Sequence, residues 1–288
     1  MRKLNFEVKQ MGDRNRDGSF TTQSDRARML SLIANQLHEM GFYHMGACSL
    51  RTNHVDALVE RWKQEGISTG TLKNRLATLR WWAEKIGKRN VVKPNNADYG
   101  IGKRAQVTNV SKAITLDQNQ LEQIKDDYTR ASLMLEAAFG LRREESLKII
   151  PKQADHGNVL QLQASWTKGG RERSVPIITF EQRLALDYAK QVAGAYSLIP
   201  QGLSYRDQLH KFRHQCAQAG ISRVHGLRHR YAQQRYLAYT GWPCPAAGGP
   251  STRRLPPDKA IRDKEARRLI SEEMGHNRPQ ITAVYCGR

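Results

Sequence analysis

Apolar residues recur every three or four positions along most of this 288-residue chain. Residues 24–41, 53–66 and 68–87 show this spacing, and each stretch ends at a glycine, which favours the end of a helix. Ser24 is a suitable N-cap, so we expect the first helix to begin there, after a short segment that carries no further domain. The pattern predicts amphipathic helices that bury their apolar faces against one another.

One stretch departs from the helical spacing. Residues 158–177, NVLQLQASWTKGGRERSVPI, alternate apolar and polar side chains on both sides of Gly169 and Gly170, which predicts a β-hairpin. The expected fold class is therefore mainly α with a small antiparallel β-sheet (α+β). Helical spacing resumes after the hairpin over four further stretches, 180–193, 204–219, 226–238 and 258–275.

The chain also shows where its domains divide. Residues 91–113 are rich in Asn, Gly and Lys and keep no period, as is typical of a linker. We therefore expect a helical domain over 1–95, a linker over 96–114 and a larger domain over 115–288. Within the larger domain, residues 240–257, TGWPCPAAGGPSTRRLPP, predict an irregular and mainly exposed loop.

Positive charge limits the partners of such a chain. Lysine and arginine number 47 against 27 acidic residues, and the excess is spread over both halves. This distribution suits a polyanion contacted by two parts of the molecule, although a merely basic soluble protein stays an alternative. No apolar run is long enough to cross a membrane, no secretory signal begins the chain, and the four cysteines show no paired spacing, so we expect a cytoplasmic, nucleoid-associated protein.

Four short stretches carry the residues with chemical potential: GLRREES, TKGGRERSVP, HGLRHRYA and the closing MGHNRPQITAVYCGR. Taken singly, each has an ordinary interpretation. Arg142 could pair with Glu145, Lys168 could be a solvated hairpin residue, and Tyr285 could belong to the core. The stretches contribute Arg142, Lys168, His225, Arg228, His276 and Tyr285.

Taken together, these residue types suit attack on a phosphodiester. Two guanidinium groups match the oxygens of a phosphoryl group in transition, and they stabilise its charge without a metal. A tyrosine hydroxyl becomes a nucleophile when a neighbouring base accepts its proton, and a lysine can protonate the leaving oxygen. A metal pair at His225 and His229, or a site at His210, His214 and Cys216, is the weaker interpretation because no third ligand stands near the first pair; we expect no metal and no cofactor.

In this order and spacing the residues resemble the tyrosine recombinase (phage integrase) family. FGLRREES resembles its first arginine box, TKGGRERSVPI its lysine-bearing hairpin, and HGLRHRYA its His-x-x-Arg box. MGHNRPQITAVY is similar to its Gly-His box, in which the nucleophile follows nine residues after the histidine. The resemblance covers residues 115–285 well and the N-terminal helices more loosely. It implies a SAM-like core-binding domain and a catalytic domain that form a C-shaped clamp on duplex DNA.

The resemblance also implies a role for each residue. Arg142 and Arg228 would hold the scissile phosphate, and His276 would donate a hydrogen bond to it. Those three residues would bind the group under attack.

The remaining three would move protons and form the covalent bond. Lys168 would act as general acid on the 5′ leaving oxygen, and His225 would assist as base. Tyr285 would form a 3′-phosphotyrosyl link that a 5′-hydroxyl later reverses.

The implied function is site-specific DNA recombination, with integration or excision of a mobile element by a homo-tetramer on synapsed sites and, among its partners, an accessory DNA-bending protein. A type IB-like topoisomerase and a catalytically silent DNA-binding protein are alternatives, whereas a metal-dependent nuclease would need clustered carboxylates that these boxes lack. The residues expected to contact DNA are Lys73, Arg75, Arg80, Lys103, Arg104, Arg171, Arg253 and Arg254.

Two features depart from the family pattern. Arg228 and His276 stand 48 positions apart, and we assign the excess to the 240–257 loop. The given sequence also ends three residues after Tyr285, where family members commonly continue with a segment that docks on a neighbouring protomer. Neither departure removes a residue of the catalytic set.

Overall fold

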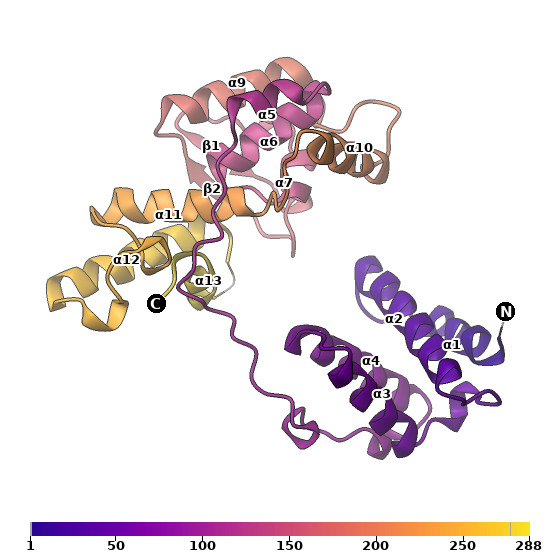
Figure 1. The fold of residues 1–288 in the computed structure, drawn as a ribbon. Coiled ribbons are helices and arrows are strands. Elements are labelled where there is room, and N and C mark those ends of the chain that lie inside the picture. Colours follow the sequence, from indigo (N-terminus) through magenta and orange to yellow (C-terminus); the bar gives the residue numbers. More distant parts are fainter. Residues whose placement is uncertain (1, 277) are drawn as a thin grey trace. The chain divides into compact units, whose positions relative to one another are not determined.

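The computed structural model describes residues 2–276 and 278–288, and the chain divides into two compact units, 1–105 and 106–288 (Figure 1). The first unit is helical. Its helix α2 packs against each of the three other helices, and two tryptophans, Trp62 and Trp82, lie fully buried in its core. Their indole N–H groups are satisfied by Gln36 Oε1 at 2.8 Å and the Ala47 carbonyl at 2.9 Å. The helices are α1 (Lys3–Arg14), α2 (Phe20–Glu39), α3 (Thr52–Gln64) and α4 (Thr69–Lys85).

The start of the chain differs from the expectation. Helix α1 precedes the helix that we expected to be first, and it buries Leu4, Val8 and Met11. Helix α2 begins at Phe20 because Ser19, not Ser24, is its N-cap and accepts a hydrogen bond from the Thr22 amide. The spacing of the three buried residues of α1 is helical, so the signal was present in a segment too polar overall to stand out.

The second unit surrounds a two-stranded antiparallel sheet with helices. Strand β1 (Val159–Leu162) pairs with β2 (Arg173–Pro176), with Leu160 opposite Val175. This is the hairpin expected from the alternating pattern, and the prediction of a mainly α fold with a small antiparallel sheet is confirmed. The helices are α5 (Gln118–Gln123), α6 (Asp127–Phe139), α7 (Arg143–Lys148), α8 (Pro151–Ala154), α9 (Phe180–Ala193), α10 (Tyr205–Gln218), α11 (Gly226–Thr240), α12 (Pro257–Glu273) and α13 (Ala283–Cys286).

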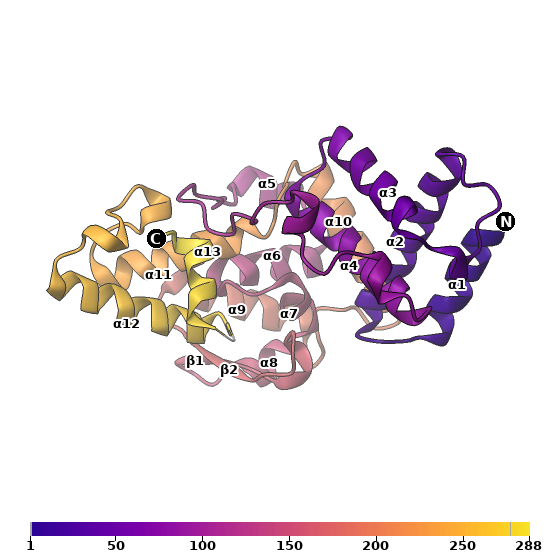
Figure 2. The same ribbon diagram turned by 90° about the horizontal axis from the view of Figure 1, so that it is seen from below.

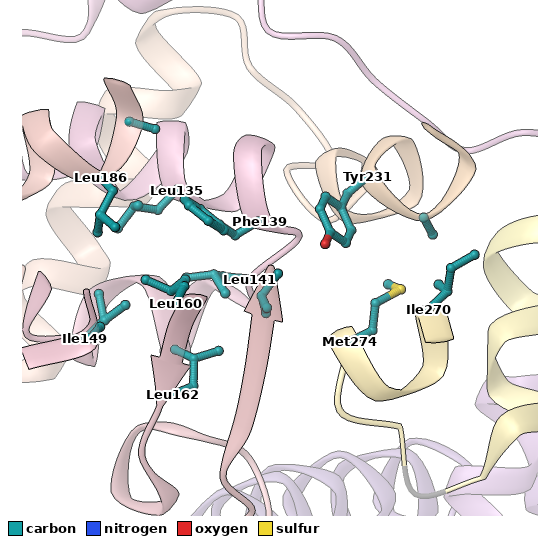
Figure 3. Close-up of a cluster of buried hydrophobic side chains, with 14 of the residues drawn as sticks. Leu135, Phe139, Leu141, Ile149, Leu160, Leu162, Leu186, Tyr231, Ile270 and Met274 are labelled. Carbon is teal, nitrogen blue, oxygen red and sulfur yellow. The ribbon is translucent and has the colours of Figure 1, made fainter. Parts of the chain in front are cut away.

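One apolar core positions the elements that matter for the site. Leu135 and Phe139 of α6 pack over the hairpin residues Leu160 and Leu162 (Figure 3). The same core continues between α11 and α12, which both ribbon views place side by side, with α13 against α11 (Figure 2). No described helix is both long and apolar enough to cross a membrane.

The 240–257 segment is only partly the exposed loop that we expected. Cys244 and Ala246 are buried, and the short 3-10 turn Pro245–Ala247 packs against α13. The expectation is wrong for this part because apolar side chains there complete the core beside the C-terminal helix. Arg253 and Arg254, further along the segment, are exposed.

Candidate active site

Arg142 stands where α6 ends and α7 begins. Gly140 ends α6 with a φ of +60°, and a β-carbon there would lie 2.5 Å from Tyr231 Cδ1, so only glycine lets α11 come this close. Arg142 follows as the N-cap of α7, and its guanidinium pairs with Glu145 at 2.7 Å. Its second nitrogen donates to the Gly275 carbonyl at 3.4 Å, next to His276.

Glu145 is fully buried between two arginines. Arg173 of β2 approaches it with both terminal nitrogens, at 3.1 and 2.6 Å, while Arg142 approaches from the other side. Burial opposes ionisation of this carboxyl, but the hydrogen bonds and charge of Arg173, together with the charge of Arg142, outweigh it and lower its pKa to about 2. Arg173 also donates through Nε to the Glu273 carbonyl at 2.9 Å, so it ties the hairpin to the end of α12.

Arg228 lies on α11 and is almost completely buried. It donates to the carbonyl oxygens of Gly140 and Met274, and its Nε has no partner among the described residues. Burial, then the charge of Arg142, lowers its pKa to about 10, so it stays a cation at neutral pH. Its guanidinium carbon lies 5.8 Å from the centre of the Tyr285 ring.

Tyr285 reaches this group from α13. Its hydroxyl lies 3.3 Å from Nε2 of His225, the residue at the N-terminal end of α11. Burial, followed by the charges of Arg228 and Arg142, lowers the pKa of His225 below its ordinary value. A neutral imidazole at hydrogen-bond distance can accept the tyrosine proton, so the pair has the geometry of a nucleophile and its base.

Two further histidines lie against the tyrosine ring. The ring of His276 stacks on it at 5.2 Å, and Nδ1 of His276 shares a hydrogen bond with the buried Thr282 hydroxyl at 3.1 Å. The centre of the His229 ring lies 4.5 Å from the centre of the Tyr285 ring. Burial lowers the pKa of His276 to about 3 and that of His229 to about 4, so both are neutral at physiological pH.

The structure therefore brings together five of the six residues expected to be catalytic. Lys168 stands apart, on the exposed loop between β1 and β2, and it makes no hydrogen bond or ion pair with the described parts of the chain. Among those parts, no group of three or more His, Cys, Asp or Glu could hold a metal ion. The five that meet are Arg142, His225, Arg228, His276 and Tyr285.

The residues expected to contact DNA fall into three groups. Arg75 pairs with Glu65 at 3.4 Å and lies over the Trp62 ring, and Arg80 donates to Asn96 Oδ1 at 2.9 Å, so both already stabilise the first unit. Lys73 is half-buried. The others are exposed: Lys103, Arg104, Arg171, Arg253 and Arg254.

Two residues near the site were not expected from the sequence to belong to the catalytic set. His229 entered it only as a metal ligand, although its position one turn after His225 already puts it on the same face of α11. Arg173 occupies an inward position of β2, two residues before the buried Val175, and the alternation of the strand signals its burial.

Comparison with known proteins follows the same division of the chain. Residues 1–92 match the family model described as phage integrase, N-terminal, and residues 102–234 match the model described as integrase. The second match ends before His276 and Tyr285. A search of curated protein sequences gave no significant match.

Solved structures share the fold at low sequence identity. A lambda integrase dimer bound to a COC′ core site aligns with a TM-score of 0.60 and 17% identity, over 97% of this chain and 77% of that one. The Tn1549 transposon integrase (aa 82–397) with circular intermediate DNA gives 0.56 and 15%, over 98% and 95%. The XerH site-specific recombinase bound to difH gives 0.56 and 15%, over 98% and 80%. With an integrase N-terminal domain followed by an integrase domain, the chain belongs to the phage integrase, or tyrosine recombinase, family.

Proposed function

We propose that this protein is a site-specific DNA recombinase that cleaves and rejoins duplex DNA through a 3′-phosphotyrosyl intermediate. The observation that carries the proposal is the Tyr285 hydroxyl at 3.3 Å from His225 Nε2, beside the buried cation of Arg228. A tyrosine packed only for stability needs neither a neutral imidazole at its hydroxyl nor a buried guanidinium at its ring. The fold shared with DNA-bound integrases supports DNA as the substrate.

The proposed reaction exchanges one phosphoester for another. Tyr285 Oη attacks the phosphorus while its proton passes to His225 Nε2. The bond from phosphorus to the 5′ oxygen breaks as the bond to Oη forms, and Lys168 supplies the proton that turns the leaving oxygen into a hydroxyl. Attack by a 5′-hydroxyl on the phosphotyrosine reverses each step, so no external energy source is needed.

The arginines bind the group that changes charge. Arg142 and Arg228 point cationic groups at one region, and Glu145 with the Gly140 and Met274 carbonyls holds them in place before any substrate arrives. Preorganised cations stabilise developing charge without reorganisation, which is a major source of catalysis in phosphoryl transfer. His276, neutral and fixed by Thr282, serves as a hydrogen-bond partner of the phosphate.

Attack in cis is part of the proposal, because Tyr285 lies in the site formed by its own chain. Integration or excision of a mobile element by a synaptic tetramer is the biological role that we propose. The type IB topoisomerase alternative shares the covalent step but joins the original ends, so strand exchange between two duplexes separates the two.

The test is covalent trapping on a nicked suicide duplex in the presence of EDTA. The sequence of the duplex comes from candidate sites in the DNA that flanks the gene. We expect a protein–DNA adduct on denaturing gels for the wild type and none for Tyr285→Phe. Two labelled duplexes in one reaction should then give exchanged products. Relaxation of supercoils without exchange would instead assign a topoisomerase, and specific binding without any adduct would contradict the catalytic proposal.

A further inference from the structure

The segment that carries the nucleophile is held mainly by contacts from elsewhere in the chain. Helix α13 has four residues, and a helix this short is not stable without tertiary contacts. The carbonyl oxygens of Tyr285, Gly287 and Arg288 each accept a hydrogen bond from a distant side chain. The donors are Gln233 Nε2 at 3.1 Å, Arg267 Nη1 at 2.9 Å and Asn109 Nδ2 at 2.9 Å, in that order.

Asn109 makes the most specific of these contacts. Its Nδ2 donates to the Arg288 carbonyl at 2.9 Å, and its Oδ1 accepts from the Arg288 amide at 2.9 Å, so one side-chain amide satisfies both backbone groups of that residue. The fit is close, because a β-carbon on Gly287 would lie 2.7 Å from Asn109 Oδ1. Asn109 is 179 positions earlier in the chain, in the segment expected to be a linker.

The residues that follow Asn109 continue along α11. Ser111 Oγ donates to Gln233 Oε1 at 3.0 Å, and the same Gln233 side chain donates to the Tyr285 carbonyl. The Ile114 amide donates to the Gly226 carbonyl at 3.2 Å, next to His225. A β-carbon on Gly226 would lie 2.7 Å from the Lys112 carbonyl, so the chain passes tightly over this end of the helix. We call residues 109–114 the strap.

The strap therefore contacts the two segments that carry the partners of the proposed proton transfer. At one end it is fixed to the residues after Tyr285, and at the other end it lies on the turn of α11 that begins with His225. The 3.3 Å separation between the tyrosine hydroxyl and the imidazole depends on how these two segments sit. A single short stretch of chain binds both segments, in addition to the direct hydrogen bond from Gln233 of α11 to the Tyr285 carbonyl.

We infer that the strap sets the position of the nucleophile and that Asn109 is a positioning residue for the cleavage step. This inference rests on the proposed function of Tyr285. Its physical basis is that the strap supplies hydrogen bonds to a segment with little stability of its own, while it contributes no group to the reacting atoms. Loss of the Asn109 amide should slow cleavage and leave folding of the unit intact, because its core does not include this residue.

The experiment compares the full-length wild type with Asn109→Ala, Ser111→Ala and the control Asn119→Ala. Asn119 is exposed, and its side chain makes no hydrogen bond in the described parts of the chain. Affinity for the suicide duplex, the single-turnover rate of adduct formation and hydrogen exchange of the peptide spanning 283–288 are measured for each. We expect roughly a tenfold fall in the rate for Asn109→Ala, a smaller fall for Ser111→Ala, unchanged affinity and faster exchange at 283–288.

The outcomes separate the inference from the function on which it rests. Absence of adduct in the wild type overturns the proposed function, and the exchange measurement then still decides whether the strap holds the segment. An active wild type whose rate and exchange are matched by Asn109→Ala overturns the inference. Equal slowing by Asn109→Ala and Asn119→Ala also overturns it, because the effect is then not specific to the strap.

Discussion

At Glu145 one buried carboxylate is shared by Arg142 and Arg173, and this residue makes the arrangement of the site sensitive to acid. Its pKa is lowered to about 2, so its carboxylate stabilises the fold fully above the ordinary range near 4.5 and loses that effect as pH falls towards 2. We expect Glu145→Gln to lower the free energy of unfolding by about 3–5 kcal/mol at pH 7, because two arginines then lose their shared partner. Chemical denaturation from pH 7 to 3 checks this; an unchanged slope of stability against pH in the variant would refute it.

Glu136 should make the free energy of unfolding depend on pH in the opposite sense. It is buried and forms no ion pair with the described residues. Burial raises its pKa to about 8, although the Ser146 hydroxyl donates to it at 3.1 Å and the charges of Arg143 and Arg228 act against the rise. A carboxyl with a raised pKa costs stability progressively as pH rises from about 4.5 to 8. Glu136→Gln should therefore remove a fall in unfolding free energy of a few kcal/mol over that range. Equal falls in the wild type and the variant, measured by denaturation, would show that Glu136 is not its source.

His225, the base in the proposed reaction, should give the rate of cleavage its dependence on pH. Because burial and nearby arginines lower its pKa, the imidazole is a free base at neutral pH and becomes protonated only in more acidic solution. The single-turnover rate of adduct formation should be level from pH 7 to 8 and fall as pH drops below about 6.5. His225→Ala should be slower at pH 7.5 and should lose the acidic fall, whereas an unaltered pH profile in that variant would assign the base elsewhere.

At the scale of elements, the junction of α6 and α7 is the critical contact. Gly140→Ala places a β-carbon within 2.5 Å of Tyr231 at a φ of +60°, and it should destabilise the protein by about 1–3 kcal/mol and displace Arg142. Gly241, at the end of α11, has a left-handed backbone conformation like that of Gly140 and has open space around it, so Gly241→Ala measures the cost of that conformation without a close contact. Thermal unfolding of both variants shows whether the contact with α11 adds to the cost of the backbone conformation. Equal destabilisation would contradict the claim that the close approach of α11 requires glycine at position 140.

The sequence predicted elements with a strong period and missed contacts that only folding creates. The hairpin was predicted from the alternation around Gly169 and Gly170. Arg142 and Arg228 were named from short motifs, and in the structure their side chains donate to the neighbouring carbonyls of Gly275 and Met274. Helix α1 was missed because its apolar residues are few. The strap was beyond prediction, since a polar segment without a period gives no sign of where its amides find partners.

At the scale of the whole molecule, net charge of +20 governs the encounter with DNA. Affinity should fall linearly with the logarithm of salt concentration, since each neutralised phosphate releases counterions. If Arg253 and Arg254 contact phosphates, Arg253→Ala with Arg254→Ala should reduce the slope by about 2 on that scale. Titration by fluorescence anisotropy at several salt concentrations gives the slope, and an unchanged value would remove both residues from the proposed DNA surface.

The identity of the residue joined to DNA decides whether Tyr285 is the nucleophile. Adduct trapped on the suicide duplex is digested with protease and nuclease, and the peptides that carry a nucleotide are sequenced by mass spectrometry. We expect a 3′-phosphotyrosyl nucleotide on Tyr285 alone, formed equally well with EDTA. A nucleotide on any other residue, or cleavage that leaves no nucleotide on the protein, would contradict it.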